Sequence, residues 1–233
     1  CYLDFYFDIS MVDEKLIPYI SLLASLLGKL DTEERSYSEL SNDIYVSTGG
    51  IELDAIAYSE KDNDQIFYPK FLVKGKAIGE ENTIKLIELI KEIITKTKIE
   101  DEKRIKELLQ QIKSRIEMSI FDIGHSLAAG RVGSYFSSSG KYIEKLKGLE
   151  YYWFISNILD DFDNNKDEVL SNLNILYKEI FNINNLIISF TGDKEDFGLI
   201  QDNLHLVTDN LNTNKWEEHK YIFPDSKLNE GIL

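Results

Sequence analysis

The first ten residues, CYLDFYFDIS, alternate strictly between two kinds of side chain. Successive side chains of a β-strand point to opposite faces, so this pattern predicts a strand with one buried face and one wetter face. The residues expected on the buried face are Leu3, Phe5, Phe7 and Ile9. Those expected on the wetter face are Tyr2, Asp4, Tyr6 and Asp8. A chain that opens in this way needs a sheet with one covered face and one open face.

The next segments predict two helices followed by a hairpin. Apolar residues at helical spacing indicate a helix over 14–30. Ser36 and Glu39 stand at the spacing of a capping box and predict the start of the second helix. That helix is expected to end at Gly49 and Gly50, which can adopt the positive φ of a helix end. Two strand patterns follow, separated by the polar sequence KDNDQ at 61–65.

The rest of the chain is mostly helical. We expect helices at 81–98, 101–136, 141–160, 167–181 and 194–211, a loop at 137–140 and one late strand at 185–193. The long helix could kink at Gly124, Gly130 or Gly133. Early strands, a helical middle and one returning strand predict an α+β fold: a mainly antiparallel sheet of about four strands with helices packed on one face. The strands of that sheet are expected at 1–9, 51–59, 67–78 and 186–192.

Composition narrows the possible functions. The 233 residues carry a formal net charge of −15, which disfavours nucleic acid as a partner because phosphates require positive charge. There is no run of 18 uninterrupted apolar residues, so we expect no membrane span. The single cysteine, Cys1, excludes an internal disulfide, and with no signal peptide at the start we expect a cytoplasmic location. The chain begins without Met and directly on a strand, so we expect a piece of a longer polypeptide.

One motif suggests a serine hydrolase. GHSLA at 124–128 is similar to the G-x-S-x-G nucleophile elbow, with Ser126 as nucleophile and Asp209 and His219 as partners in the chain order of that enzyme class. The elbow requires a strand before its turn, whereas here a helical pattern precedes it, and the fifth position is Ala128 rather than Gly. Close packing of a helix through small residues explains the motif better.

A second motif is similar to a calcium loop. Asp161, Asp163 and Asn165 match its first ligand positions, but Lys166 replaces the required Gly and Asn172 replaces the bidentate Glu. A solvated loop that caps the next helix is the better interpretation.

The histidines and tryptophans give no further site. His125, His205 and His219 have no His or acid at helical metal spacing, and His125 is expected to be a hydrogen-bonded packing residue. Trp153 and Trp216 are most simply packing residues.

Three segments together resemble a known family. YLDFYFDIS, the stretch from EKLIPYISLLAS through SYSELS to STGGI, and FDIGHSLAAGRVGSYFSSSG resemble the peptidase-associated domain of the presequence-protease group of insulinase/pitrilysin-type zinc metallopeptidases. The resemblance covers about residues 1–212 and is most specific over the first 51. It implies one noncatalytic domain, the third of four α+β domains, with 213–233 as a linker or tail toward the fourth.

The family also implies where the chemistry lies. Its first domain carries H-x-x-E-H, in which two imidazoles bind zinc and the Glu activates water. Here the matching segment is Ser21-Leu22-Leu23-Ala24-Ser25, so both imidazoles and the base are replaced. The family's third ligand, a Glu on a later helix, corresponds to the stretch 113–122, where Arg115 or Glu117 is nearest. We therefore expect no catalytic residue, no metal ligand and no cofactor in this chain, with zinc confined to the catalytic domain of the parent protein.

The resemblance finally implies a role and its partners. The parent would be a metalloendopeptidase that degrades unfolded peptides inside a chamber formed by two closing halves. This chain would form part of the chamber wall, with Tyr2, Asp4, Tyr6 and Asp8 as candidate peptide contacts. Its partners would be the catalytic half of the same polypeptide and the unfolded peptide. The alternatives are the hydrolase at Ser126 and a stand-alone acidic interaction domain.

Overall fold

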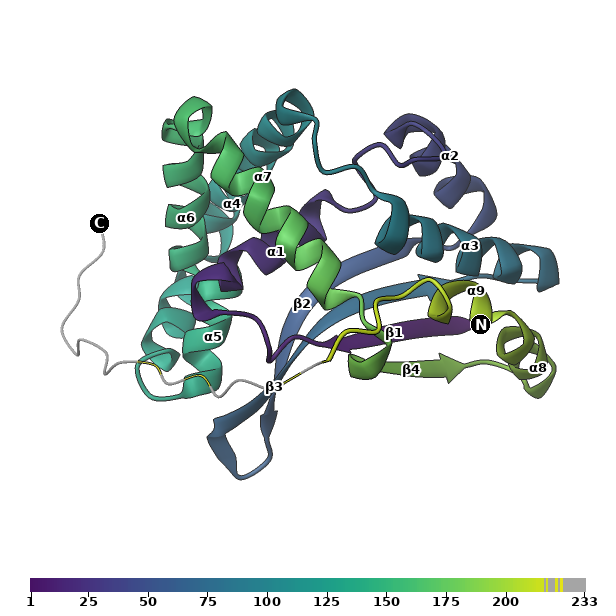
Figure 1. The fold of residues 1–233 in the computed structure, drawn as a ribbon. Helices are drawn as coiled ribbons and strands as arrows, with labels where there is room; N and C mark the ends of the chain where they lie inside the picture. The colour runs from purple at the N-terminus through teal and green to yellow at the C-terminus, as the bar shows by residue number, and fades with distance from the viewer. Residues whose placement is uncertain (216, 218–220, 222, 224–233) are drawn as a thin grey trace.

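The sheet has four strands in the order β2-β3-β1-β4, and every neighbouring pair is antiparallel (Figure 1). The computed structural model describes residues 1–215, 217, 221 and 223. The strands are β1 (Tyr2–Asp8), β2 (Ile51–Glu60), β3 (Asn63–Lys76) and β4 (Leu186–Thr191). The predicted α+β fold with a four-stranded antiparallel sheet is confirmed.

The two faces of β1 differ as the alternation predicts. Leu3, Phe5 and Phe7 are fully buried, and Phe5 lies opposite Val73 of β3 and Ile188 of β4. Burying a large apolar side chain stabilises a fold by about 1.5–3 kcal/mol, so this face anchors the core. The opposite face of β1 carries Tyr2, Asp4, Tyr6 and Asp8, all of them at least partly exposed.

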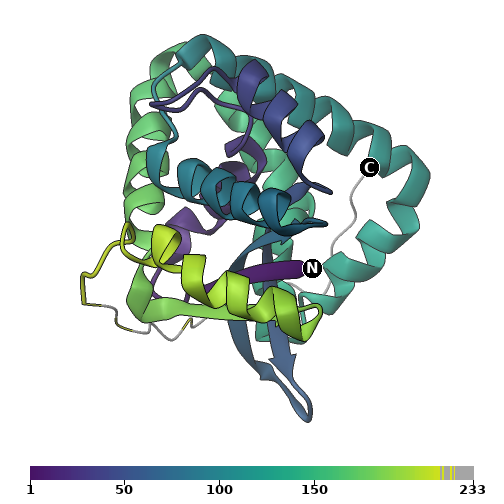
Figure 2. The same ribbon diagram turned by 90° about the vertical axis from the view of Figure 1, so that its right-hand side faces the viewer.

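Helices cover the buried face of the sheet (Figures 1 and 2). The main contacts with the strands come from α1, α3 and α5, and the other helices pack on these three or beside the sheet. Gly75 of β3 allows α3 to lie close, because a Cβ at this position would stand 2.6 Å from a methyl group of Leu86. The helices are η1 (Glu14–Leu16), α1 (Ile17–Leu26), α2 (Tyr37–Ser47), α3 (Glu80–Lys96), α4 (Glu102–Gly133), α5 (Ser138–Lys147), α6 (Leu149–Asp160), α7 (Phe162–Ile180), η2 (Ile183–Asn185), α8 (Lys194–Asn203) and α9 (His205–Thr208).

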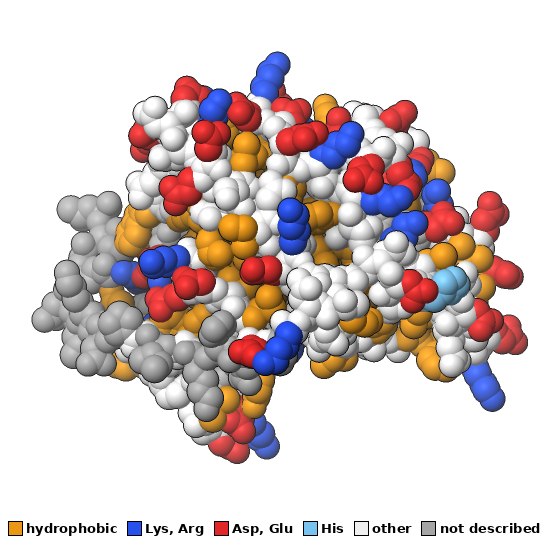
Figure 3. All heavy atoms as spheres, in the orientation of Figure 1, with side chains coloured by type: hydrophobic (Ala, Val, Ile, Leu, Met, Phe, Trp, Pro, Cys, Tyr) orange, Lys and Arg blue, Asp and Glu red, His pale blue; other side chains and the backbone are white. Residues whose placement is uncertain are grey.

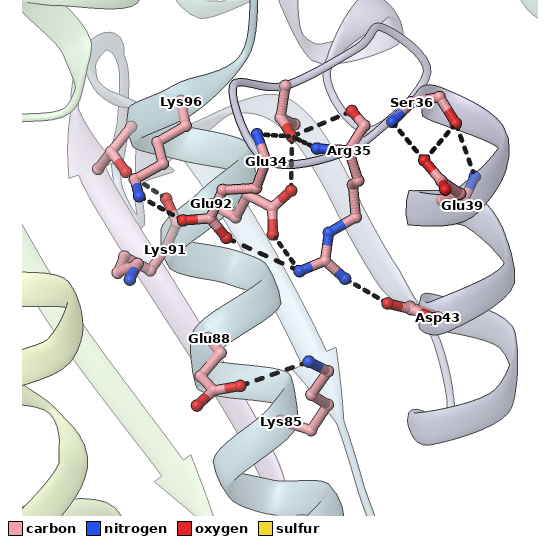
Figure 4. A network of polar contacts seen from close by, with 12 residues as sticks. Glu34, Arg35, Ser36, Glu39, Asp43, Lys85, Glu88, Lys91, Glu92 and Lys96 are labelled. Atoms are coloured by element: carbon pink, nitrogen blue, oxygen red, sulfur yellow. Dashed lines mark hydrogen bonds and ion pairs between the residues drawn. The ribbon is translucent and has the colours of Figure 1, made fainter.

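The start of α2 is fixed by two polar devices (Figure 4). The predicted capping box is present, since Ser36 accepts from the Glu39 amide and Glu39 accepts from the Ser36 amide. Just before it, Arg35 forms ion pairs with the buried Glu92 of α3, at 2.9 Å, and with Asp43 of α2. These contacts hold α2 against α3, and α2 leads directly to the Gly49–Gly50 turn at the end of the sheet.

Two predictions about the middle of the chain are wrong. Residues 137–140 are not a loop, because α5 begins at Ser138 with the Ser137 side chain accepting from the Gly140 amide. The single helix expected over 141–160 is broken at Gly148. There the buried Glu144 carboxylate accepts from the amides of Leu149 and Glu150 and so caps α6.

Three helix boundaries also differ from expectation. α4 departs from helical geometry at Ile123, with φ −125°, next to Gly124 and before the other two glycines. α7 begins at Phe162 rather than at 167, and the helix expected over 194–211 is divided into α8 and α9.

Part of the segment after residue 212 packs on the domain. The Tyr221 hydroxyl donates to the backbone carbonyls of Ile9 and Val12, at 3.2 and 2.8 Å. The Tyr221 and Phe223 rings both lie against Phe67 of β3. Residue 212 as the domain boundary stays a prediction.

Candidate functional site

The open face of the sheet is the candidate site, and the strand register arranges its side chains in rows. Asp4 of β1 lies opposite Lys74 of β3, and Lys74 lies opposite Glu52 of β2, so one row alternates in charge. The other open-face side chains from β2, β3 and β4 are Asp54, Ile56, Tyr58, Tyr68, Lys70, Leu72, Lys76, Ile187, Ser189 and Thr191. The result is a surface of tyrosines and charges of both signs, and none of its residues is a histidine or cysteine.

Two carboxylates on this face have defined partners. Asp8 pairs with Lys70 on the adjacent strand and accepts from both the amide and the hydroxyl of Ser10, at 2.9 and 2.6 Å. Tyr6 donates to Asp4 across 3.4 Å. Burial, and after it the negative charge of Asp4, raise the pKa of the Tyr6 hydroxyl above its ordinary value of 10.0. Tyr6 therefore stays a neutral donor and acceptor at physiological pH.

The face deepens at the end of the sheet beside the Gly49–Gly50 turn. A hollow of about 370 Å³ lies there, lined by Tyr2, Asp4, Gly49, Gly50, Ile51, Glu52, Lys74, Gly75 and Lys76. A second hollow of about 550 Å³ adjoins it and shares Tyr2, Gly49 and Lys76. Gly50 has φ +117°, a conformation that other residues rarely adopt, so the shape of this turn depends on glycine. Hydroxyls, ammonium groups and carboxylates at this end can bind backbone and side chains of a polypeptide through hydrogen bonds and charge.

Sequence reasoning identified only the β1 members of this face. Lys74, Glu52 and Tyr58 come from β2 and β3, and Ile187 comes from β4. Their alternation was visible in the sequence, but which face they share with Tyr2 depends on the register between strands. A one-residue shift would move each of them to the core side.

The segment that matches H-x-x-E-H lies on α1, with its small side chains turned inward. Ser21 and Ala24 are each 8% exposed, and Ser25 is half-buried. Glu117, the nearer candidate for a third ligand, accepts from the Tyr152 hydroxyl at 3.1 Å. Arg115, the other candidate, is exposed. Among the described residues, no group of three or more His, Cys, Asp or Glu side chains could hold a metal ion.

The structure does not support the hydrolase motif. Ser126 and His125 lie inside α4, where His125 is exposed, whereas a nucleophile elbow requires a strand followed by a tight turn. The expectation that His125 is a packing residue is therefore wrong. Asp209 follows α9, and His219 lies outside the described residues, as does Trp216.

The calcium-like residues are also in helical surroundings. Asp161 immediately precedes α7, while Asp163 and Asn165 lie within it. Asp163 pairs with Lys106 of α4 at 3.0 Å, and the Asp161 carboxylate accepts from the Asn164 side chain at 2.6 Å. Across the part of the chain that the structure describes, no helix is both long enough and apolar enough to cross a membrane.

Comparison with known proteins decides the family. The model of the peptidase-associated family, the one that accompanies subfamily C of the M16 peptidases, matches residues 1–158. This chain belongs to that family. The resemblance to a peptidase-associated domain that the sequence motifs carry is thereby confirmed.

Several relatives of this peptidase-associated chain are much longer than it. Protein HypA of Clostridium perfringens is 37% identical over the whole chain, which spans 24% of that relative. Presequence protease 1 of Arabidopsis thaliana, described as chloroplastic/mitochondrial, is 24% identical over 82% of the chain. The mitochondrial presequence protease of Saccharomyces cerevisiae is 28% identical over 78%, and the chain spans 18% of each of these two proteases.

A solved structure supports the fold of the chain. A conserved protein from Enterococcus faecalis superposes with a TM-score of 0.57 at 14% identity, over 87% of this chain and 46% of that one. At this level of identity the similarity concerns the fold alone.

Proposed function

We propose that this peptidase-associated chain is a noncatalytic domain of a longer, zinc-dependent peptidase that degrades unfolded peptides. Two presequence proteases among its relatives support the reaction class. The replacement of H-x-x-E-H by Ser21-Leu22-Leu23-Ala24-Ser25 supports a noncatalytic role, because serine hydroxyls are poor zinc ligands and Ala24 cannot activate water. In this proposal zinc and the reacting groups belong to the catalytic half of the same polypeptide. The cytoplasmic location stays a prediction.

The open sheet face is proposed as part of the wall that encloses the peptide. One observation carries this assignment: helices cover the apolar face, while the opposite face, with Tyr2 at 59% exposure, is left open. Tyrosines can contact varied side chains with little loss of conformational entropy, and charges of both signs can meet varied peptides. An unfolded peptide, which has no fixed surface to match, is therefore a suitable ligand for Tyr2, Asp4, Tyr6 and Asp8.

A photo-crosslinking experiment tests the proposal. A photoreactive phenylalanine analogue placed at Tyr2 or Tyr6 in the longer polypeptide should attach to an unfolded peptide that is a substrate. The same analogue at Tyr45, which is 85% exposed on α2, serves as the matched control and should remain unattached. Equal attachment at all three positions would show that the sheet face is not the contact surface.

The isolated chain provides the second part of the test. With a quenched-fluorescent peptide and added zinc, the 233-residue chain should give no cleavage. Chelator-sensitive cleavage by this chain alone would contradict the noncatalytic assignment.

A further inference from the structure

The second half of α4 has an inner face that is fully engaged. Arg131 donates to Glu150 at 2.8 Å and to Glu144 at 3.3 Å, and its guanidinium carbon stands 5.5 Å from the centre of the Trp153 ring. Ser134, just past the end of α4, is buried. These contacts fix which side of α4 faces α5 and α6, and therefore which side faces out.

The outer face of the same half is rich in apolar side chains and uncovered. Neighbouring side chains on one side of a helix recur three or four residues apart. The large ones here are Met118, Phe121, Val132 and Phe136, which are 69%, 91%, 53% and 65% exposed. His125, Ala128 and Ala129 lie between them and are at least partly exposed. We call these seven residues the α4 outer face.

Charge is scarce on this face. Of the whole chain 29% of residues are charged, yet between Ile116 and Phe136 the charged residues are Glu117, Asp122 and Arg131. Glu117 accepts from Tyr152, and Arg131 is bound to the acids of α5 and α6. Monomeric proteins rarely leave contiguous large apolar patches exposed, and such patches mark interaction surfaces.

The choice of occupant follows from charge and from chain length. Each copy carries a net charge of −15, and Figure 3 shows acidic side chains spread over the face that it draws rather than gathered in one patch. Two copies would therefore repel each other over much of their surfaces. The relatives, in contrast, carry most of their length outside the matched region, since this chain spans 24% of one and 18% of two others. A partner on the same polypeptide has a high effective concentration and needs less contact area to stay bound.

We propose that the α4 outer face docks against an apolar surface of another domain of the longer polypeptide. This inference rests on the proposed function, because that function supplies the longer chain. It adds which surface makes the contact. The glycines of this half agree with a close approach, since a Cβ at Gly124, Gly130 or Gly133 would meet no atom of this chain within 4 Å.

Thiol labelling tests the docking surface. In a Cys1→Ser background, which removes the one native thiol, Phe121→Cys is compared with Gln111→Cys, an exposed position earlier on α4. Phe121→Cys should react about tenfold more slowly in the longer polypeptide than in the 233-residue chain, because its labelling must await opening of the interface. Gln111→Cys should react at the same rate in both. Equal rates for Phe121→Cys overturn the inference.

Two further outcomes separate this inference from the proposed function. If Phe121→Cys is unprotected while Tyr2 and Tyr6 still crosslink to peptide, only the docking surface is wrong. If the chain is not part of a longer polypeptide, both fail together. Sedimentation of the 233-residue chain should show a monomer, and a dimer abolished by Phe121→Ser overturns the inference by identifying a second copy as the occupant.

Discussion

Arg35→Ala should strongly destabilise the domain because it strands a buried charge. Glu92 is 1% exposed, and its two carboxylate oxygens lie 2.9 Å from an Arg35 nitrogen and 2.6 Å from the Thr32 hydroxyl. Removing one partner of a buried ion pair costs about 3–5 kcal/mol. The Arg35 side chain is 19% exposed, so water can reach part of the space it vacates, and the Thr32 hydrogen bond remains. We therefore expect the lower end, about 3 kcal/mol, in urea unfolding followed by circular dichroism.

Two matched variants check the cause. Adding Glu92→Gln to Arg35→Ala removes the stranded charge and should recover about 1–2 kcal/mol of the loss. Asp43→Asn leaves the Arg35–Glu92 pair intact and removes a more exposed contact, so it should cost about 1 kcal/mol or less. The reasoning fails if Arg35→Ala lies within about 1 kcal/mol of the parent, or if the double variant shows no recovery.

Three further predictions follow from other parts of the structure. The triple variant Ser21→His, Ala24→Glu, Ser25→His should lose about 2–4 kcal/mol of stability, because Ser21 and Ala24 are buried, and should cleave no quenched-fluorescent peptide with added zinc, because Glu117 is held by Tyr152; zinc-dependent cleavage would contradict this. Tyr221→Phe should cost about 1 kcal/mol in urea unfolding through the lost donation to Ile9 and Val12, whereas no change would indicate that this segment does not contribute to the fold. Burial raises the pKa of Tyr142 and Tyr177 above 10.0, so the stability they contribute is complete below pH 10.0 and is lost as the pH rises further; unfolding free energies that stay constant above that pH, with tyrosine ionisation followed by absorbance, would argue against it.

The parts of the fold that sequence predicted correctly depend on local rules. The alternation in β1 determines which side chains can face a core, whatever the neighbouring strands are. The capping box of α2 involves only Ser36, Glu39 and their own backbone amides. The polar sequence between β2 and β3 could be interpreted as a turn without knowledge of the sheet.

The parts that were wrong depend on contacts between distant residues. The break at Gly148 requires Glu144 to turn back onto the start of α6 while Arg131 of α4 compensates its charge. A Cβ at Gly148 would stand 2.0 Å from a Glu144 carboxylate oxygen, so glycine is needed there for a reason that arises only in the folded chain. Helical periodicity continues through this point and gives no sign of the break.

The candidate site shows the same division. Tyr2, Asp4, Tyr6 and Asp8 could be placed on one face because they belong to one strand. Lys70 could not be assigned as the partner of Asp8, since this pair joins strands 62 residues apart in the chain. The hollow beside Gly50 depends on three strand ends meeting, which needs both the register and the positive φ of that residue.

The two proposed surfaces belong to opposite layers of the domain, and this arrangement has a functional consequence. The open face consists of strand residues, whereas α4 packs on α5, α6 and α7 in the helical layer that covers the other side of the sheet. Changes at sites that are far apart and share no partners usually have additive effects. Substitutions on the α4 outer face should therefore weaken attachment to the rest of the polypeptide without changing peptide crosslinking at Tyr2. A domain built in this way can be held from behind by its helices while its sheet stays free to face a peptide.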